Sequence, residues 1–139
     1  MRWLQEPSLI KGNMVGGKIK GLASVINAGG LGWMVPKGFV VFPEETCEAI
    51  GNFLAQNVDD HCLYAVRSSG ISEDGVAASF AGQHLTKLNV KACDVPKAIQ
   101  EVRESAANSI LYAQALGVKH ETAMPALIQE MVQPAIAGV

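Results

Sequence analysis

The sequence has few cysteines, few charged residues and few aromatic residues, and it has no long apolar run. Its three cysteines include no CxxC pair, which predicts reduced and mostly buried thiols in a cytosolic protein: Cys47, Cys62 and Cys93. No segment approaches the roughly 20 apolar residues that a membrane-spanning helix needs. The first residues also lack the apolar core of a signal peptide. We therefore expect a cytoplasmic protein without a membrane partner.

The charge balance argues against a nucleic-acid partner. There are 11 basic and 13 acidic residues, which give a net charge of −2, and no basic run is present. The three histidines are scattered and lack the spacing of a zinc site: His61, His84 and His120. Because 49% of the residues are hydrophobic and only 17% are charged, we expect some apolar surface to lie against a partner or further chain.

Periodicity predicts helices and strands in alternation. Apolar residues recur at three- and four-residue steps from Ile19 to Ile26 and again over residues 95–117, and another helix is expected to begin at Pro43. Strands are predicted over residues 35–42, 63–67, 83–90 and 124–132, after an irregular segment at residues 1–15. The last strand is expected to be exposed and open to pairing with another chain. This order predicts an α/β fold, a mixed sheet with about three helices packed on it.

Two cations stand in patterns that suit an anion site. Lys18 follows two glycines at the start of a helix, where backbone N–H groups and the helix dipole favour negative charge. Arg67 ends an apolar strand and precedes a polar loop that contains glycine, as a phosphate-binding arginine would. Taken alone, each pattern is more often a surface turn with a solvated cation.

A series of short motifs resembles the N-terminal nucleotide-binding domain of one enzyme group. That group comprises the phosphoenolpyruvate synthases, the pyruvate phosphate dikinases and the rifampin phosphotransferases. The resemblance covers about residues 13–139. The motifs occur in the same order, at residues 15–18 (VGGK), 28–30 (AGG), 35–41 (VPKGFVV), 65–69 (AVRSS), 73–74 (ED), 78–83 (ASFAGQ) and 127–132 (LIQEMV).

The resemblance implies an ATP-grasp fold. It also implies an enzyme that cleaves ATP and passes the β-phosphoryl group to a histidine on a separate, swivelling domain. Lys18 and Arg67 match the phosphate-binding lysine and arginine of the group, and they are the candidate catalytic residues. Gly82 and Thr86 match positions on a loop and the following strand that contact the nucleotide, and Gln129 matches a glutamine near the adenine.

The resemblance further implies a Mg²⁺ cofactor in the full-length enzyme. Its ligands would come from the second half of the domain, which is not in this sequence, and the phosphohistidine domain is not in it either. We therefore expect residues 1–139 to form a single domain, the N-terminal part of an ATP-grasp nucleotide-binding domain that is inactive alone. The alternative is a non-catalytic, stand-alone nucleotide-binding or regulatory module. An unrelated α/β interaction domain would require the ordered motifs to be coincidental.

Overall fold

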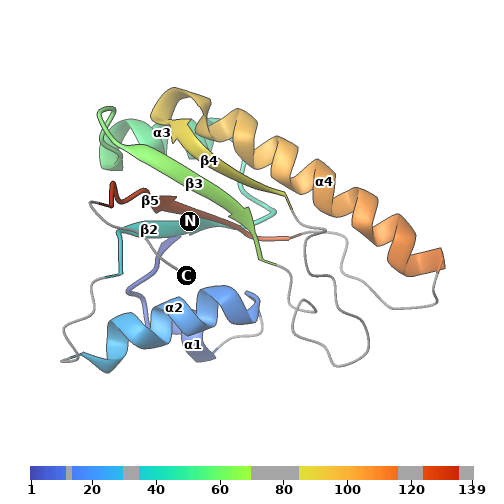
Figure 1. The fold of residues 1–139 in the computed structure, drawn as a ribbon, viewed down its shortest axis with the longest axis horizontal. Coiled ribbons are helices and arrows are strands. Elements are labelled where there is room, and N and C mark those ends of the chain that lie inside the picture. The colour runs from blue at the N-terminus through green and yellow to red at the C-terminus, as the bar shows by residue number, and fades with distance from the viewer. Residues whose placement is uncertain (12–13, 30–34, 70–84, 116–123, 135–139) are drawn as a thin grey trace.

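The structure, a computed structural model, describes residues 1–11, 14–29, 35–69, 85–115 and 124–134 (Figure 1). Within these ranges, five strands form one sheet that has helices on both faces, which confirms the predicted α/β class. The strands are β1 Arg2–Trp3, β2 Gly38–Val41, β3 Leu63–Ser68, β4 Thr86–Lys91 and β5 Ala126–Glu130. The helices are α1 Ser8–Lys11, α2 Gly17–Ala28, α3 Cys47–Asn57 and α4 Val95–Ala115, and a short 3-10 helix, η1 Ala92–Asp94, precedes α4.

The strand order is β1-β2-β5-β3-β4, and each described pairing is antiparallel. No parallel pair of the expected mixed sheet lies among the described residues. The expectation of an exposed last strand was wrong, because β5 pairs with β2 on one side and with β3 on the other. Its successive residues Leu127 and Ile128 are both fully buried, one on each face of the sheet. A strand that is buried on both faces has a continuous run of apolar residues in its sequence. Such a run does not show whether the strand lies in the middle of the sheet or at its edge.

Two apolar clusters hold the helices to the two faces of the sheet. On one face, Ile19 and Ala23 of α2 pack with Val40 of β2 and Leu127 of β5. On the other face, α3 and α4 cover the alternate residues of β2, β3 and β5. Burying one large apolar side chain contributes about 1.5–3 kcal/mol, so each cluster fixes its helices firmly. The α4-side cluster consists of Phe39, Val41, Ile50, Leu54, Tyr64, Val66, Val90, Ala92, Val95, Ala98, Ile99, Val102, Ala126 and Ile128.

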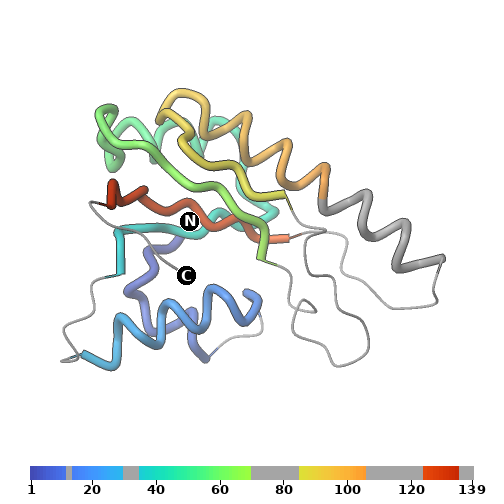
Figure 2. Tube along the Cα trace, in the orientation of Figure 1, coloured from blue at the N-terminus to red at the C-terminus, as the bar shows by residue number. Residues whose placement is uncertain are grey.

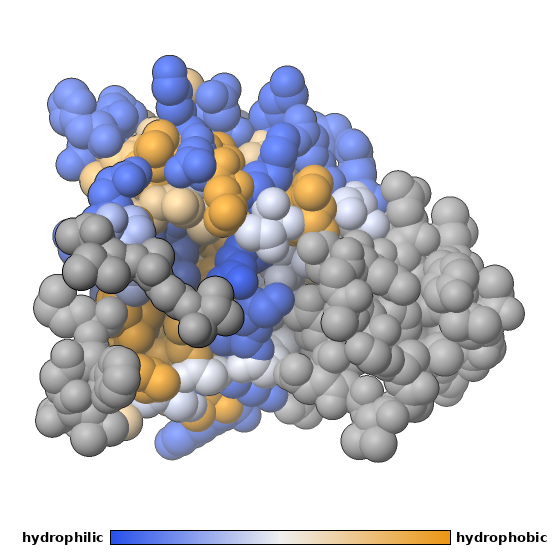
Figure 3. All heavy atoms as spheres, viewed as in Figure 1, coloured by the Kyte–Doolittle hydropathy of each residue, from blue (hydrophilic) through white to orange (hydrophobic). Residues whose placement is uncertain are grey.

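The edge strand β4 contains a bulge that the alternation of its sequence does not show. Tyr64 pairs with Val90 and Val66 pairs with Lys87, so a step of two residues along β3 is matched by three along β4. Asn89 has a φ of 57°, a left-handed conformation that asparagine tolerates. The bulge breaks the two regular faces predicted for residues 83–90. It also leaves Leu88 exposed. Figure 3 shows that apolar and hydrophilic side chains alternate over the described part of the molecular surface in this view.

Helix α3 begins at Cys47, so the expectation of a helix start at Pro43 was wrong. The Thr46 hydroxyl accepts a hydrogen bond from the Ala49 N–H at 3.2 Å and caps the helix. Pro43 lies instead in a turn that is closed by Glu45, whose carboxylate accepts a hydrogen bond from the Phe42 N–H at 3.2 Å. Glu45 therefore stabilises a turn before the helix.

The N-terminal segment, expected to be irregular, contributes the short edge strand β1. Arg2 and Trp3 pair with Val40 and Phe39 of β2. The Trp3 ring lies edge-on to Phe39, with ring centroids 5.9 Å apart, and the N-terminal ammonium pairs with Glu45. Aromatic contacts of this kind contribute about 0.5–1.5 kcal/mol beyond their buried area. These side-chain contacts hold β1 in place. A strand of two residues is too short to show a periodic pattern in the sequence.

The thiols are free but less buried than expected: Cys47 and Cys93 are exposed, and Cys62 is half-buried. Cys47 is exposed because the first residue of α3 lies beyond the turns of that helix that pack on the sheet, where Ile50 and Leu54 are buried. Among the described helices, none is both long enough and apolar enough to cross a membrane.

Candidate functional site

Arg67 lies near the end of β3, on the face of the sheet that α2 covers. Along β3 the alternate residues Tyr64 and Val66 are buried on the α4 side, whereas Arg67 is half-buried on the other side. Arg67 pairs with Leu127 of β5, which belongs to the cluster under α2. Since directly opposed residues share a face, the arginine and α2 are on the same side of the sheet.

Lys18 is the second residue of α2 and lies on the same side. Its neighbour Ile19 is fully buried against Val40 and Leu127, which fixes the first turn of α2 on this face. In Figure 2 the start of α2 and the end of β3 lie at the same end of the sheet. The structure therefore brings Lys18 and Arg67, which are 49 positions apart in the sequence, to the same face and the same end of the sheet.

The first turn of α2 itself favours an anion. Gly16 is the N-cap residue, no side chain caps the helix, and no acidic residue lies in its first turn. The first N–H groups of a helix have no partner within the helix, and they carry about half a positive charge together. The 12-residue helix α2 therefore presents positive potential next to Lys18.

Thr86 and Gln129 lie on the same face as Arg67. Thr86, at the start of β4, is exposed and lies directly opposite Arg67. Gln129 on β5 is opposite Ala65 of β3, two residues before the arginine. Its Nε2 atom donates a hydrogen bond to the Pro36 carbonyl at 3.2 Å, so this side chain also holds the segment before β2.

Three successive residues at the end of β3 have polar side-chain atoms that are buried without a hydrogen-bond partner in the described ranges: Arg67 Nε, Ser68 Oγ and Ser69 Oγ. A buried polar atom that lacks a partner costs about 1–3 kcal/mol, so three in a row call for an explanation. A bound anion would accept hydrogen bonds from the unpaired donors on the Arg67 face. The phosphate groups of a nucleotide are anions of this kind. The sequence reasoning did not single out Ser69, although a count of two from Arg67 along a strand would have placed it on the same face.

Gly82 and the loop residues Glu73 and Asp74 lie outside the described residues, as does His84. The contact with the nucleotide that was predicted for Gly82 therefore stays a prediction. Within the described ranges, no group of three or more His, Cys, Asp or Glu side chains could hold a metal ion.

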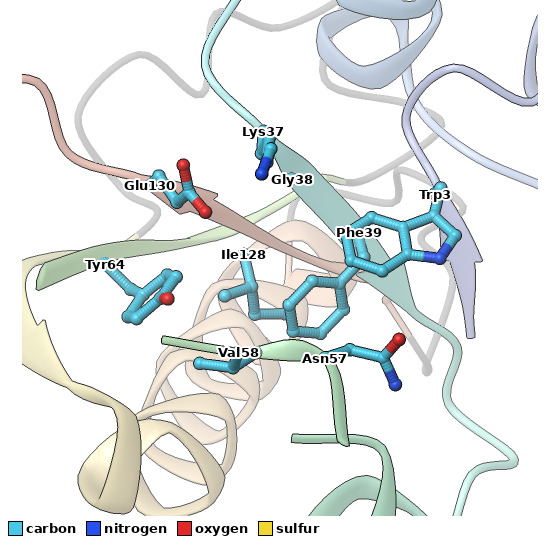
Figure 4. A pocket seen from close by; sticks show the side chains of 9 residues that line it. All are labelled: Trp3, Lys37, Gly38, Phe39, Asn57, Val58, Tyr64, Ile128 and Glu130. Atoms are coloured by element: carbon cyan, nitrogen blue, oxygen red, sulfur yellow. The ribbon is translucent and has the colours of Figure 1, made fainter. Parts of the chain in front are cut away.

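A small pocket lies on the opposite face from Arg67 (Figure 4). It encloses about 200 Å³, part of it open to solvent, and Lys37 and Glu130 lie on one side of it. Tyr64 points its ring into the pocket, and its hydroxyl donates to the Asp59 carbonyl at 3.0 Å. Burial raises the pKa of Tyr64 to about 12, so the phenol is not suited to acid–base chemistry near neutral pH. The pocket is separate from the cationic face, and we assign it no part in the site.

Comparison with known proteins identifies the family. Residues 42–139 match the family model described as the pyruvate phosphate dikinase AMP/ATP-binding domain, and the chain belongs to this family. The match includes Arg67, Thr86 and Gln129 but starts after α2. An AMP/ATP-binding domain agrees with the cationic face that Arg67 occupies.

Related proteins include rifampicin phosphotransferases and phosphoenolpyruvate synthases. A rifampicin phosphotransferase of Bacillus subtilis is 32% identical over 106 residues, which cover 72% of this chain and 12% of that protein. A probable phosphoenolpyruvate synthase of Methanocaldococcus jannaschii is 39% identical over 85 residues, which cover 58% of this chain and 7% of that protein. The phosphoenolpyruvate synthase of Escherichia coli is 41% identical over 84 residues, which cover 58% of this chain and 11% of that protein. The chain thus spans about an eighth or less of the relatives that it resembles.

Proposed function

We propose that the chain is the N-terminal part of an ATP-grasp nucleotide-binding domain in a phosphotransferase. That enzyme would cleave ATP and pass the β-phosphoryl group to a histidine on another domain, as the resemblance implies. The observation that supports the proposal most directly is the placement of Lys18 and Arg67 on one face and at one end of the sheet. The family match and the names of the relatives support the same class of reaction.

In this proposal the chain's own residues bind and orient the phosphates. Lys18 and the first N–H groups of α2 would neutralise charge from the helix side, and Arg67 would do so from the sheet. Thr86, opposite Arg67, would add a hydroxyl at the solvent-facing edge. ATP supplies the phosphoryl group, and phosphoryl transfer depends mainly on positioning and on electrostatic stabilisation rather than on covalent chemistry by the protein.

In this proposal, the rest of the site would come from a further segment of the polypeptide. The proposal assigns magnesium binding to the second part of the domain, since the described residues offer no cluster of ligands for it. It makes that second part and a phosphohistidine domain the partners of this chain, in the cytoplasm where ATP is abundant. The chain alone would then form an incomplete site with weak affinity and no turnover.

Calorimetric titration with ATP tests the proposal. It would be made on the 139-residue chain and on the protein encoded by the complete reading frame that contains it. We expect weak or undetectable binding by the chain and tighter binding by the longer protein. Arg67→Ala and Lys18→Ala should each weaken binding about 10- to 100-fold, because each removes a hydrogen bond to a charged group.

Two matched variants control for the loss of positive charge as such. Lys20→Ala removes a lysine from the same turn of α2, and Lys91→Ala removes one from the far end of the β3–β4 pair. Both should leave the affinity within about twofold, because screened surface charges contribute little. An unchanged affinity in Arg67→Ala would remove Arg67 from the site. Tight binding without ATP cleavage by the longer protein would favour a regulatory module.

A further inference from the structure

Ser69 continues the strand geometry of β3 beyond its last assigned residue. Its N–H donates to the Pro125 carbonyl at 3.0 Å, which extends the β3–β5 ladder by one pair. The alternation of a strand therefore places Ser69 on the same face as Arg67, two residues earlier. The backbone of Ser69 is thus anchored, and its side chain lies on the cationic side of the sheet.

The Ser69 side chain is fully buried, at 0% exposure, and its Oγ has no hydrogen-bond partner within the described part of the chain. Folding has removed this hydroxyl from water, and no acceptor for it lies among the residues that the structure describes. The Nε atom of Arg67, on the same face, is also buried and also lacks a hydrogen-bond partner among the described residues. Two unsatisfied donors that share one face at one strand end call for a common acceptor, and an anion can accept from both.

Ser68 provides the contrast within the same protein. It is 2% exposed and its Oγ also lacks a partner, but it pairs with Ala126 on the opposite face. Its neighbours there, Val66 and Ala126, belong to the apolar cluster beneath α4. The two serines are therefore matched in residue type, burial and unmet hydrogen bonding, and they differ in the face that they occupy.

We propose that the Ser69 hydroxyl donates a hydrogen bond to a phosphate oxygen of the nucleotide that binds beside Arg67, whereas Ser68 makes no contact with the nucleotide. This inference rests on the proposed function and adds a binding residue to that site. The donor is short and rigidly held, so it selects for an oxyanion close to the strand end. The polyphosphate, and not the nucleoside, is the part of the ligand that Ser69 recognises.

Calorimetric titrations of the protein from the complete reading frame test the inference with three probes: ATP, inorganic tripolyphosphate and adenosine. Ser69→Ala should weaken binding of ATP and of tripolyphosphate about 10- to 100-fold, as expected for a lost hydrogen bond to a charged group. Binding of adenosine should be unchanged. Ser68→Ala, the matched control, should bind all three probes as the unaltered protein does.

Thermal unfolding without nucleotide separates binding from a structural role. Because the Ser69 hydroxyl has no partner among the described residues, Ser69→Ala should unfold at the same temperature as the unaltered protein or at a higher one. A lowered melting temperature together with equal losses for all three probes would show a structural role and overturn the inference. Ser69→Cys provides a second variant in case the alanine form folds poorly. A thiol is a weak donor, so it too should lose affinity for ATP.

The outcomes distinguish the inference from the function on which it rests. If Arg67→Ala loses ATP affinity and Ser69→Ala does not, the proposed function stands and the role of Ser69 is wrong. If the unaltered protein binds neither ATP nor tripolyphosphate, both are wrong. Equal loss in Ser68→Ala and Ser69→Ala would also overturn the assignment, because the two serines lie on opposite faces.

Discussion

Arg67 and Thr86 lie directly opposite each other on the antiparallel strands β3 and β4. The Cβ atoms of such pairs are about 4.5–5.5 Å apart, and the two side chains share a face. Arg67 is half-buried and Thr86 is exposed, so the pair leads from the interior of the sheet to its solvent-facing edge. The edge strand β4 is thereby joined to the cationic face on which the proposed site depends.

The first prediction concerns this Thr86 hydroxyl. Thr86→Val keeps a β-branched side chain on an exposed strand position, so the free energy of unfolding should change by less than about 0.5 kcal/mol. If Thr86 contacts the nucleotide, ATP affinity should fall about 3- to 10-fold, since a neutral hydrogen bond contributes roughly 0.5–1.5 kcal/mol. Calorimetric titration measures the affinity, and urea unfolding measures the stability.

Thr86→Ser is the matched variant, because it keeps the hydroxyl and removes only a methyl group. It should bind ATP within about twofold of the unaltered protein. Equal losses in the valine and serine variants would point to strand packing instead of a hydroxyl contact. No loss in either variant would remove Thr86 from the site.

The second prediction concerns the structural role of Gln129. Its Nε2 atom donates to the Pro36 carbonyl at 3.2 Å, and a carboxylate at this position could not donate. Gln129→Glu should therefore lower the free energy of unfolding by about 0.5–1.5 kcal/mol, as measured by urea unfolding without nucleotide. Gln133→Glu, an exposed control with the same charge change, should stay within about 0.5 kcal/mol. Unchanged stability in Gln129→Glu would show that the hydrogen bond to Pro36 contributes nothing.

The strands and helices with strong periodicity were predictable from the sequence, because burial on one face imposes that periodicity. The stripe from Ile19 to Ile26 gave α2, and the apolar run before Arg67 gave β3. The pairing of β1 was not predictable, since Trp3 is held by ring contacts with Phe39 and Phe53, which are distant in sequence. The middle place of β5 likewise depends on its partners, not on its own residues.

The candidate site was predictable in part for a related reason. Lys18 and Arg67 stand in local patterns that a sequence displays, a glycine pair before a helix and a strand before a polar loop. That they share a face follows from the packing of Ile19 on Leu127, which is a tertiary contact. The unsatisfied Ser69 hydroxyl could not be foreseen, because the absence of a partner is a property of the folded surroundings.

The third prediction concerns the close approach of strands at Gly38. A Cβ atom there would lie 2.8 Å from the Ile128 carbonyl oxygen and 2.8 Å from Leu4 Cδ1. The backbone oxygen cannot move without disturbing the β2–β5 pair, so Gly38→Ala should destabilise the protein by about 1–3 kcal/mol. Gly51→Ala in α3 is the control. It meets nothing within 4 Å and should stabilise the protein by up to about 1 kcal/mol. Urea unfolding of both variants checks the opposite signs, and a neutral Gly38→Ala would contradict the strand spacing.

The fourth prediction is a loss of stability at alkaline pH through Tyr64, which is only 2% exposed. Burial raises the pKa of Tyr64 to about 12 from the ordinary value of 10.0. Below pH 10 the phenol is neutral in the folded and the unfolded chain, so its contribution to stability is fully present. As the pH rises from about 10 to about 12, the unfolded chain ionises first, and the free energy of unfolding should fall by about 2–3 kcal/mol.

Urea unfolding between pH 8 and pH 12 would measure this fall, and Tyr64→Phe is the matched variant. The variant loses the hydrogen bonds that the Tyr64 hydroxyl makes with Asp59, at 3.0 Å to its carbonyl and 3.1 Å from its N–H. It should therefore be less stable by about 0.5–1.5 kcal/mol at neutral pH. Because it has no phenol at this position, the part of the alkaline fall that belongs to Tyr64 should disappear. An equally steep fall in Tyr64→Phe would assign the alkaline transition to other groups and would mean that the pKa of Tyr64 is not raised.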